Sequence, residues 1–217
     1  MHIQPTLRLQ SFGFCIGSLF FAVGAVPGLA SAMGATTTNI VFFIGSWFFT
    51  GAAFVQLILA GPRTIPYKNG RAISAVWLVA SAQFVGTILF NVSTGSAIRT
   101  HAAHAEQVNV WAPDAAGSVA FLVSAAFGIL GLIRSHELMR LIYRDSLSGW
   151  VNMTGCIAFG VSAVAAYVYT DGVTVDTHLA NLGTLVGAIC FFLAAMFYLG
   201  RGSAGDSAES VSQQEAV

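Results

Sequence analysis

The chain has 217 residues, of which 56% are hydrophobic and only 8% are charged, and its nine basic and nine acidic residues leave no formal net charge. This composition is typical of an integral membrane protein and leaves no room for a separate soluble domain. The absence of a basic stripe with interleaved aromatic residues argues against nucleic-acid binding.

Six apolar runs follow one another along the chain, and each is close to the roughly 20 residues that a helix needs to cross a bilayer. They cover about residues 11–33, 39–61, 73–95, 115–133, 147–169 and 179–200. The runs are apolar on all sides, whereas the strands of a membrane barrel would alternate apolar and polar residues. Turn signals such as Gly61-Pro62, Asn69-Gly70 and Ala112-Pro113 separate the runs. The sequence therefore predicts an all-α polytopic membrane protein with six transmembrane helices.

The loops between these helices predict how the chain is oriented. Eight of the nine basic residues fall on one side of six alternating helices, and only Arg99 falls on the other. The positive-inside rule then places both termini in the cytoplasm. Residues 1–200 form a single transmembrane domain in this interpretation, and the polar residues 201–217 form a disordered cytoplasmic tail. Arg8 and Ala30-Ser31-Ala32 also fit a cleaved signal peptide, but the first run is longer than a typical signal core of about 7–15 residues.

Each of the six runs contains a glycine, then a small residue and, four positions after the glycine, a phenylalanine. The pairs are Gly17 and Phe21, Gly45 and Phe49, Gly86 and Phe90, Gly117 and Phe121, Gly155 and Phe159, and Gly187 and Phe191. The glycines of the odd-numbered helices lie 69 and 69 residues apart, and those of the even-numbered helices lie 72 and 70 apart. This spacing predicts three tandem two-helix repeats over about residues 10–71, 72–145 and 146–200.

Small residues let helix backbones approach closely in lipid, where no hydrophobic force pairs helices. We therefore predict that the repeated motif packs helices together, with each phenylalanine ring opposite a glycine of a partner helix. A role for the motif in lining a ligand site stays open as the alternative.

The phrases FFIGSWFFTGAA, QFVGTILFNVST, PDAAGSVAFLVSAA and GWVNMTGCIAFGVSAVAAYV resemble those of bacterial, especially actinobacterial, integral membrane proteins with YrhK-like two-helix units. The resemblance covers most of residues 10–200. It implies a helical fold in a bacterial plasma membrane. That family has no established activity, so the resemblance implies neither a function nor any site residues.

Amide side chains lie inside several of the predicted helices. Gln83 and Asn152 stand three positions before the motif glycine, where the first repeat has Phe14, and Asn91 directly follows Phe90. Because an amide in hydrocarbon needs a hydrogen-bond partner, we expect these side chains to face inward. Gln83, Asn91 and Asn152 are candidates for a polar path, and hydrogen bonding between helices is the alternative. No ionisable residue lies deep in any predicted helix, which argues against a proton-driven carrier.

Histidine and acidic residues gather in the loops on the non-cytoplasmic side. If residues 98–107 extend the third helix, His101 and His104 lie one turn apart, and His178 stands in the other loop. Imidazole and carboxylate groups suit zinc or another divalent ion, which makes these three histidines candidates for a metal site. Sensing of pH and a plain solvated loop are the alternatives.

These features predict a passive conduit or a binding protein for a small solute or ion, with no cofactor and no enzymatic activity. A non-transporting scaffold, sensor or partner subunit is the alternative. A membrane-embedded metalloenzyme that uses the outer cluster of histidines and aspartates, among them Asp114, Asp171 and Asp176, is a third. The lipid bilayer surrounds the chain in all three interpretations. A second copy of the chain or another membrane protein is the expected partner.

Overall fold

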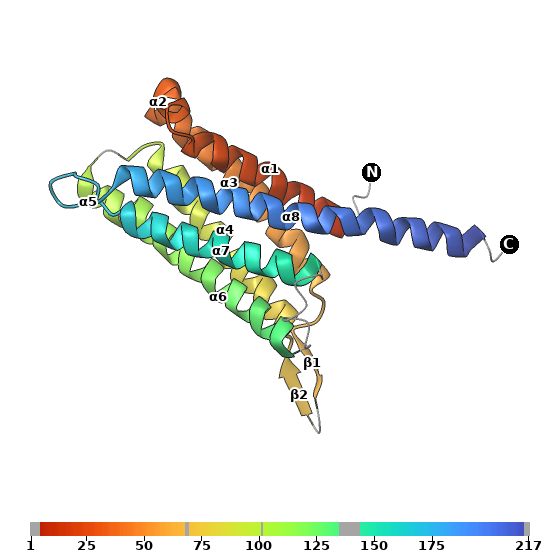
Figure 1. Cartoon of the computed structure of the whole chain (residues 1–217). Helices are drawn as coiled ribbons and strands as arrows, with labels where there is room; N and C mark the ends of the chain where they lie inside the picture. The colour runs from red at the N-terminus through yellow and green to blue at the C-terminus, as the bar shows by residue number, and fades with distance from the viewer. Residues whose placement is uncertain (1–4, 68–69, 101, 135–143, 215–217) are drawn as a thin grey trace.

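The structure is a computed structural model that describes residues 5–67, 70–100, 102–134 and 144–214. Among these residues, six helices are long and apolar enough to cross a membrane, which confirms the predicted all-α polytopic architecture. They run side by side as one elongated bundle (Figure 1). The six candidate spans are Leu7–Ala25, Ala35–Leu59, Ala75–Ala97, Ala103–Ile133, Ser146–Ala165 and Thr177–Leu199.

The six long helices form three hairpins. In these, α1 (Leu7–Ala25) packs against α3 (Ala35–Leu59), α4 (Ala75–Ala97) against α6 (Ala112–Arg134), and α7 (Arg144–Ala165) against α8 (Thr177–Gln214). Contacts between α3 and α4, between α6 and α7, and between α8 and α1 close the three hairpins into a ring. Equivalent residues of the three repeats therefore surround one common axis.

The motif glycines lie where the two helices of each hairpin meet. The glycine of each helix lies against the motif ring of the other helix, and a Cβ added to any of the six glycines would stand 2.6–2.9 Å from a ring carbon. The pairs are Gly17 with Phe49, Gly45 with Phe21, Gly86 with Phe121, Gly117 with Phe90, Gly155 with Phe191, and Gly187 with Phe159. Glycine is needed at these positions because any side chain would occupy the space of the ring.

The six motif phenylalanines meet on the bundle axis and form the core of the molecule. We call this cluster the phenylalanine plug: Phe21, Phe49, Phe90, Phe121, Phe159 and Phe191. Phe21, Phe90 and Phe159 form a triangle with ring centroids 5.8–6.2 Å apart. Each of these rings contacts its hairpin partner in a second layer at 4.9–5.2 Å. Because every ring is at most 4% exposed, the two layers close the axis.

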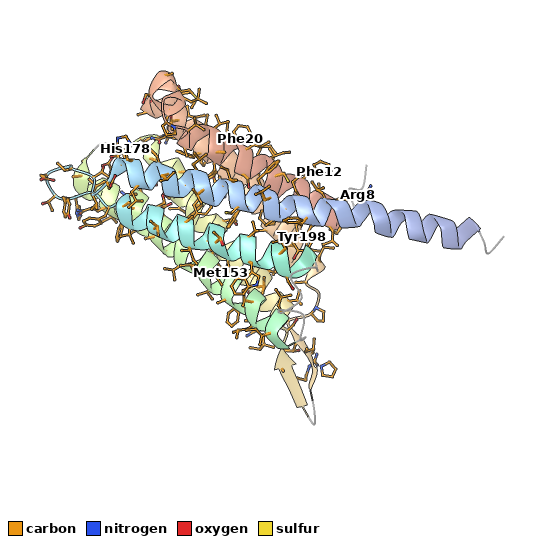
Figure 2. All side chains as sticks on the ribbon, in the orientation of Figure 1. Arg8, Phe12, Phe20, Met153, His178 and Tyr198 are labelled. Carbon is orange, nitrogen blue, oxygen red and sulfur yellow. The ribbon has the colours of Figure 1, made fainter. Side chains whose placement is uncertain are left out.

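Apolar side chains cover the outside of the bundle (Figure 2). Phe12 on α1 and Phe54 on α3 are both more than half exposed. Lipid tails are as apolar as these side chains, so such a surface is stable in a bilayer and not in water. The surface thus agrees with a membrane location.

The first helix ends earlier than the predicted boundary at residue 33. A proline disfavours the helical conformation of the residue before it, and Val26, which precedes Pro27, is extended with φ −63° and ψ 121°. Gly28 then adopts a positive φ of 84°, and a short separate helix, α2 (Leu29–Met33), follows. The apolar run is therefore one membrane helix plus a turn.

The fourth helix begins at Ala103 instead of near residue 115. It consists of α5 (Ala103–Glu106), the π-helical turn η1 (Gln107–Trp111) and α6 without interruption. The sequence interpretation took Ala112-Pro113 as a turn. Proline lacks a backbone N–H and crowds the preceding turn of an α-helix, and the wider turn of η1 lies directly before it. Pro113 is therefore accommodated inside a continuous helix.

Two connections and the C-terminal end of the chain differ from the prediction. Strands β1 (Thr64–Tyr67) and β2 (Gly70–Ile73) form an antiparallel hairpin where the sequence indicated only turns. The fifth helix, α7, ends at Ala165 instead of residue 169, because Val168 pairs with Thr174 in a folded loop. Finally, α8 continues to Gln214 beyond the bundle (Figure 1), where the sequence predicted a disordered tail. Extending an existing helix avoids the cost of nucleation, and residues 201–214 contain no proline.

Candidate functional site

Two cavities lie at opposite ends of the bundle, on either side of the phenylalanine plug. The amide cavity is lined by Gln56, Gln83 and Asn152 and has a volume of about 310 Å³. The carboxylate cavity is lined by Glu106 and Asp114 and has a volume of about 230 Å³. Phe191 of the plug lines the amide cavity, and three other plug residues, Phe21, Phe90 and Phe159, line the carboxylate cavity. The plug therefore separates two spaces on the same axis.

Equivalent positions of the three repeats surround the amide cavity. Three positions before the motif glycine, α1, α4 and α7 carry Phe14, Gln83 and Asn152, and all three line this cavity. Eleven positions after the motif glycine, α3, α6 and α8 carry Gln56, Gly128 and Tyr198, which also line it. The repeat axis thus passes through the cavity, while the different side chains give it an asymmetric chemistry.

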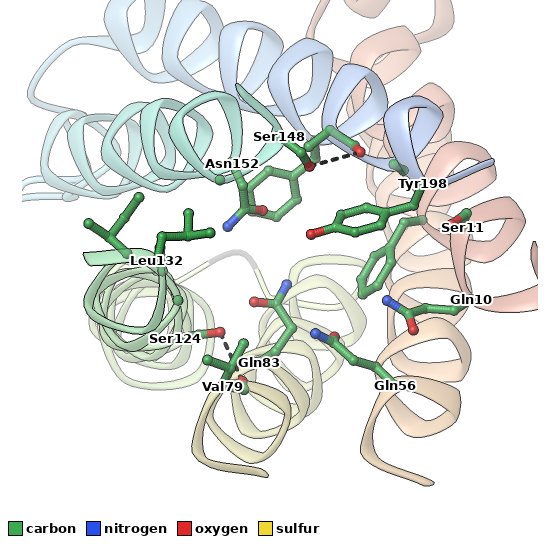
Figure 3. A pocket seen from close by; sticks show the side chains of 18 residues that line it. Gln10, Ser11, Gln56, Val79, Gln83, Ser124, Leu132, Ser148, Asn152 and Tyr198 are labelled. Carbon is green, nitrogen blue, oxygen red and sulfur yellow. Dashed lines mark hydrogen bonds between the residues drawn. The ribbon is translucent and has the colours of Figure 1, made fainter. Parts of the chain in front are cut away.

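Gln83 is buried, with 5% of its surface exposed, and its side-chain amide has no hydrogen-bond partner among the described residues. Figure 3 shows this amide pointing into the amide cavity. Leaving a buried amide unpaired costs about 1–3 kcal/mol. Water or a ligand in the cavity is therefore needed to satisfy it.

Two further amides in the cavity lack strong partners. The Gln56 Oε1 atom is buried without a hydrogen bond to the described residues. The Asn152 Nδ2 atom lies 3.9 Å from the Cys156 thiol sulphur, which is a weak acceptor. Gln83 and Asn152 offer donors and acceptors to a molecule in the cavity, whereas the Gln56 Oε1 atom is itself fully buried.

Two of the three serines that line the amide cavity already donate hydrogen bonds. Ser124 donates a hydrogen bond to the Val79 carbonyl at 2.9 Å, and Ser148 donates to the Ala194 carbonyl at 3.1 Å (Figure 3). Among its described lining residues there is no Asp, Glu, Lys, Arg or His. The lining therefore suits an uncharged molecule that hydrogen-bonds to amides.

Asn91 does not lie in the amide cavity. Its Nδ2 atom donates to the Thr50 Oγ1 atom at 2.9 Å, and the Ser46 and Thr94 hydroxyls lie 3.1 Å apart at the same contact between α3 and α4. The prediction that Asn91 shares a path with Gln83 and Asn152 is therefore wrong. One residue beyond Phe90 is about 100° further around the helix, which turns Asn91 away from the axis.

Because Asn91 and Thr50 form a hydrogen bond between helices, we expect a double-mutant cycle of Asn91→Leu and Thr50→Val to give a coupling of about 0.6 kcal/mol, the average for such bonds in a membrane. Unfolding in detergent by denaturant would measure it. Ligand binding in the amide cavity should stay as in the wild type. Loss of binding in Asn91→Leu at unchanged stability would instead assign Asn91 to the solute path.

Asp114 is a candidate that the sequence interpretation places wrongly, in the outer loop with His101, His104 and Glu106. It lies within the fourth membrane-spanning helix and lines the carboxylate cavity, so an ionisable residue does lie inside a span. It stands three positions before Gly117, in the register where Phe42 and Thr184 of the other repeats also line this cavity. The position three residues before the motif glycine is also the one that identifies Gln83 and Asn152, in the first helices of the second and third hairpins. The same position in the second helix of the second hairpin identifies Asp114.

The structure describes two of the three histidine candidates for a metal site, His104 and His178. His101 lies outside the described residues, and His104 and His178 are exposed at the end of the bundle (Figure 2 labels His178). Because α4 ends at Ala97, residues 98–107 do not extend the third helix, and His104 belongs to the fourth. Within the described ranges, no three His, Cys, Asp or Glu side chains lie close enough to hold a metal ion.

No known protein family, curated protein or solved structure matches the chain. The similarity to YrhK-like units therefore stays a prediction. What the two cavities bind must be inferred from their own geometry.

Proposed function

We propose that this chain is a membrane binding protein and conduit for a small uncharged solute, and that the phenylalanine plug holds the conduit closed. The observation that carries this proposal is the Gln83 amide, which is 5% exposed, unpaired and directed into the amide cavity. Gln56 and Asn152 supply further unsatisfied groups around the same space. An uncharged solute with both donors and acceptors would satisfy them.

The position of the plug supports a conduit over a closed binding pocket. The two cavities share the repeat axis, and only two layers of rings, 4.9–5.2 Å apart, stand between them. Apolar constrictions gate channels by excluding water from a narrow passage. Separation of a few rings would therefore join two polar spaces into one path.

The distribution of basic residues supports an orientation for this conduit. Arg8, Arg63 and Arg71 belong to the end of the bundle that holds the amide cavity, whereas Arg99 belongs to the opposite end. By the positive-inside rule, the amide cavity opens toward the cytoplasm and the carboxylate cavity toward the outside of a bacterial plasma membrane. Both termini are then cytoplasmic.

Leucine in place of Gln83 is the sharpest test of this proposal. We expect small amides and polyols that bind the wild type to raise its thermal stability in detergent, by about 2.7 kcal/mol at a concentration of 100 times Kd. The same solutes should not stabilise Gln83→Leu. Asn91→Leu is the matched control, because it removes an amide from the same helix outside the cavity, and it should retain the effect.

The opposite result would identify Gln83 as a packing residue. In that case Gln83→Leu would bind every solute as tightly as Asn91→Leu does, and proteoliposomes of the two variants would show equal solute flux. Asn152→Leu provides an independent variant at the equivalent position of the third repeat.

A non-transporting scaffold, sensor or partner subunit is the second candidate function. The observation that favours it is the completeness of the plug, since all six rings are at most 4% exposed. In a scaffold the amide cavity would hold water alone. This function predicts no solute flux even when a ring of the plug is removed.

A further inference from the structure

We propose that the carboxylate cavity is a binding site for a small organic ammonium ion. This site lies at the opposite end of the bundle from the amide cavity, and the proposal does not require that the amide cavity binds a solute. It is based on the charge of the lining, on its aromatic residues and on an enclosed hydroxyl without a partner.

The lining of this cavity brings two carboxyl groups together without a described basic side chain. Glu106 and Asp114 are its two ionisable residues, and its described lining contains no Lys, Arg or His. The Asp114 carboxylate makes no hydrogen bond and no ion pair with the described chain. Ionisable residues inside a membrane segment are costly and normally pair with a partner. The described part of the chain supplies none, so a cation in the cavity would be the partner.

The local helix geometry directs both carboxylates to the same side. Glu106, Val110 and Asp114 are spaced by four residues, and all three line the cavity. The π-helical turn η1 lies between them and has more residues per turn than an α-helix. Residues four apart therefore stay on the same face of this helix. Trp111 in this turn is fixed by a hydrogen bond from its Nε1 atom to the Ala163 carbonyl at 2.8 Å.

The aromatic lining selects the kind of cation. Five aromatic residues surround the space: Phe21, Phe42, Phe90, Trp111 and Phe159. A cation over an aromatic face is attracted to the ring, more strongly when the site is desolvated, and cages of such rings recognise alkylated ammonium groups. A divalent metal ion would favour several carboxylate ligands, and the described residues gather no three His, Cys, Asp or Glu side chains at one place. The lining therefore fits an ammonium ion with alkyl groups.

An enclosed hydroxyl completes the site. Ser93 is 4% exposed, lines the cavity, and makes no side-chain hydrogen bond within the described residues. Ser162, at the equivalent position of the third repeat, donates to the Ala180 carbonyl at 2.7 Å and lies 2.8 Å from the Thr184 hydroxyl. Ser93 is thus available as an acceptor or donor for a polar group of the ligand.

Choline and its uncharged carbon isostere, 3,3-dimethylbutan-1-ol, test this proposal on the full chain in detergent. We expect calorimetry to show that the wild type binds choline and does not bind the isostere. Asp114→Asn should weaken choline binding by about tenfold or more, which corresponds to 1.4 kcal/mol. Asp171→Asn is the matched control, because it removes an exposed carboxylate from the loop before α8, and it should bind choline as the wild type does.

Three outcomes would overturn the proposal. Equal binding of choline and its isostere would show that charge is not recognised. Displacement of choline by equimolar sodium or potassium would assign the cavity to alkali cations. Unchanged choline affinity in both Asp114→Asn and Glu106→Gln would place the site elsewhere. If Asp114→Asn does not fold, Glu106→Gln and the isostere comparison still decide the question.

Discussion

Alanine in place of Gly86 is expected to lower the free energy of unfolding by about 1–3 kcal/mol, the usual cost of overpacking a core. The new Cβ would stand 2.6 Å from two carbons of the Phe121 ring, and the Gly117 carbonyl oxygen lies 3.1 Å away. The ring is 1% exposed, and it contacts Phe90 at 4.9 Å and Phe191 at 5.7 Å. It therefore cannot move aside without separating the two helices or disturbing the plug.

Gly51→Ala is the control for this prediction. Gly51 is also helical, but a Cβ there would meet no atom within 4 Å, so alanine should leave stability unchanged or raise it slightly. Reversible unfolding of both variants in detergent would measure the difference. A second change, Phe121→Leu, should recover part of the loss in Gly86→Ala because a smaller side chain leaves room for the Cβ. Equal stability of Gly86→Ala and Gly51→Ala would show that the motif does not set the packing.

The number of spans and the residues that pack them were predictable, because every helix carries both an apolar run and one copy of the repeated motif. Six apolar runs fix the number of spans, and a glycine and a phenylalanine four residues apart lie on one helical face. Small residues control helix packing in lipid, so the repeat identified the residues that now form the plug. The closure of the three hairpins into a ring was not predictable, because it depends on the contact between α8 and α1 at the two ends of the chain.

The errors arose where one local signal was read without its context. Pro113 was read as a helix boundary, although a π-helical turn before it lets the helix continue, and this misreading moved Asp114 into a loop. Pro27 was passed over inside an apolar run, although it ends α1. Asn91 was grouped with Gln83 by residue type, although its side chain donates to Thr50 at the contact between α3 and α4 instead of entering the cavity. Register relative to the motif glycine predicts the cavity linings better than residue type does.

Alanine in place of Phe90 is expected to connect the two cavities and to lower the free energy of unfolding by about 3–5 kcal/mol, the usual cost of removing a buried ring. Phe90 contacts Phe21 at 6.0 Å and Phe159 at 5.8 Å in its own layer, and Phe121 at 4.9 Å in the other. Its removal opens the triangle and takes away the ring that packs on Phe121. The Phe121 ring of the second layer can then turn into the vacated space, which would open the second layer as well. Stopped-flow light scattering of proteoliposomes should show faster water and glycerol permeation than in the wild type.

Phe43→Ala separates this opening from general loss of stability. Phe43 packs against Gly95 between α3 and α4 and lines neither cavity, so its removal should destabilise the protein without raising permeability. Adding Gln83→Leu to Phe90→Ala should reduce the glycerol flux again, because the solute would still have to cross the amide cavity. Equal leakage from Phe43→Ala and Phe90→Ala would indicate damaged bundles instead of an opened path. No flux from Phe90→Ala would favour the scaffold, since the plug would then be a core and not a gate.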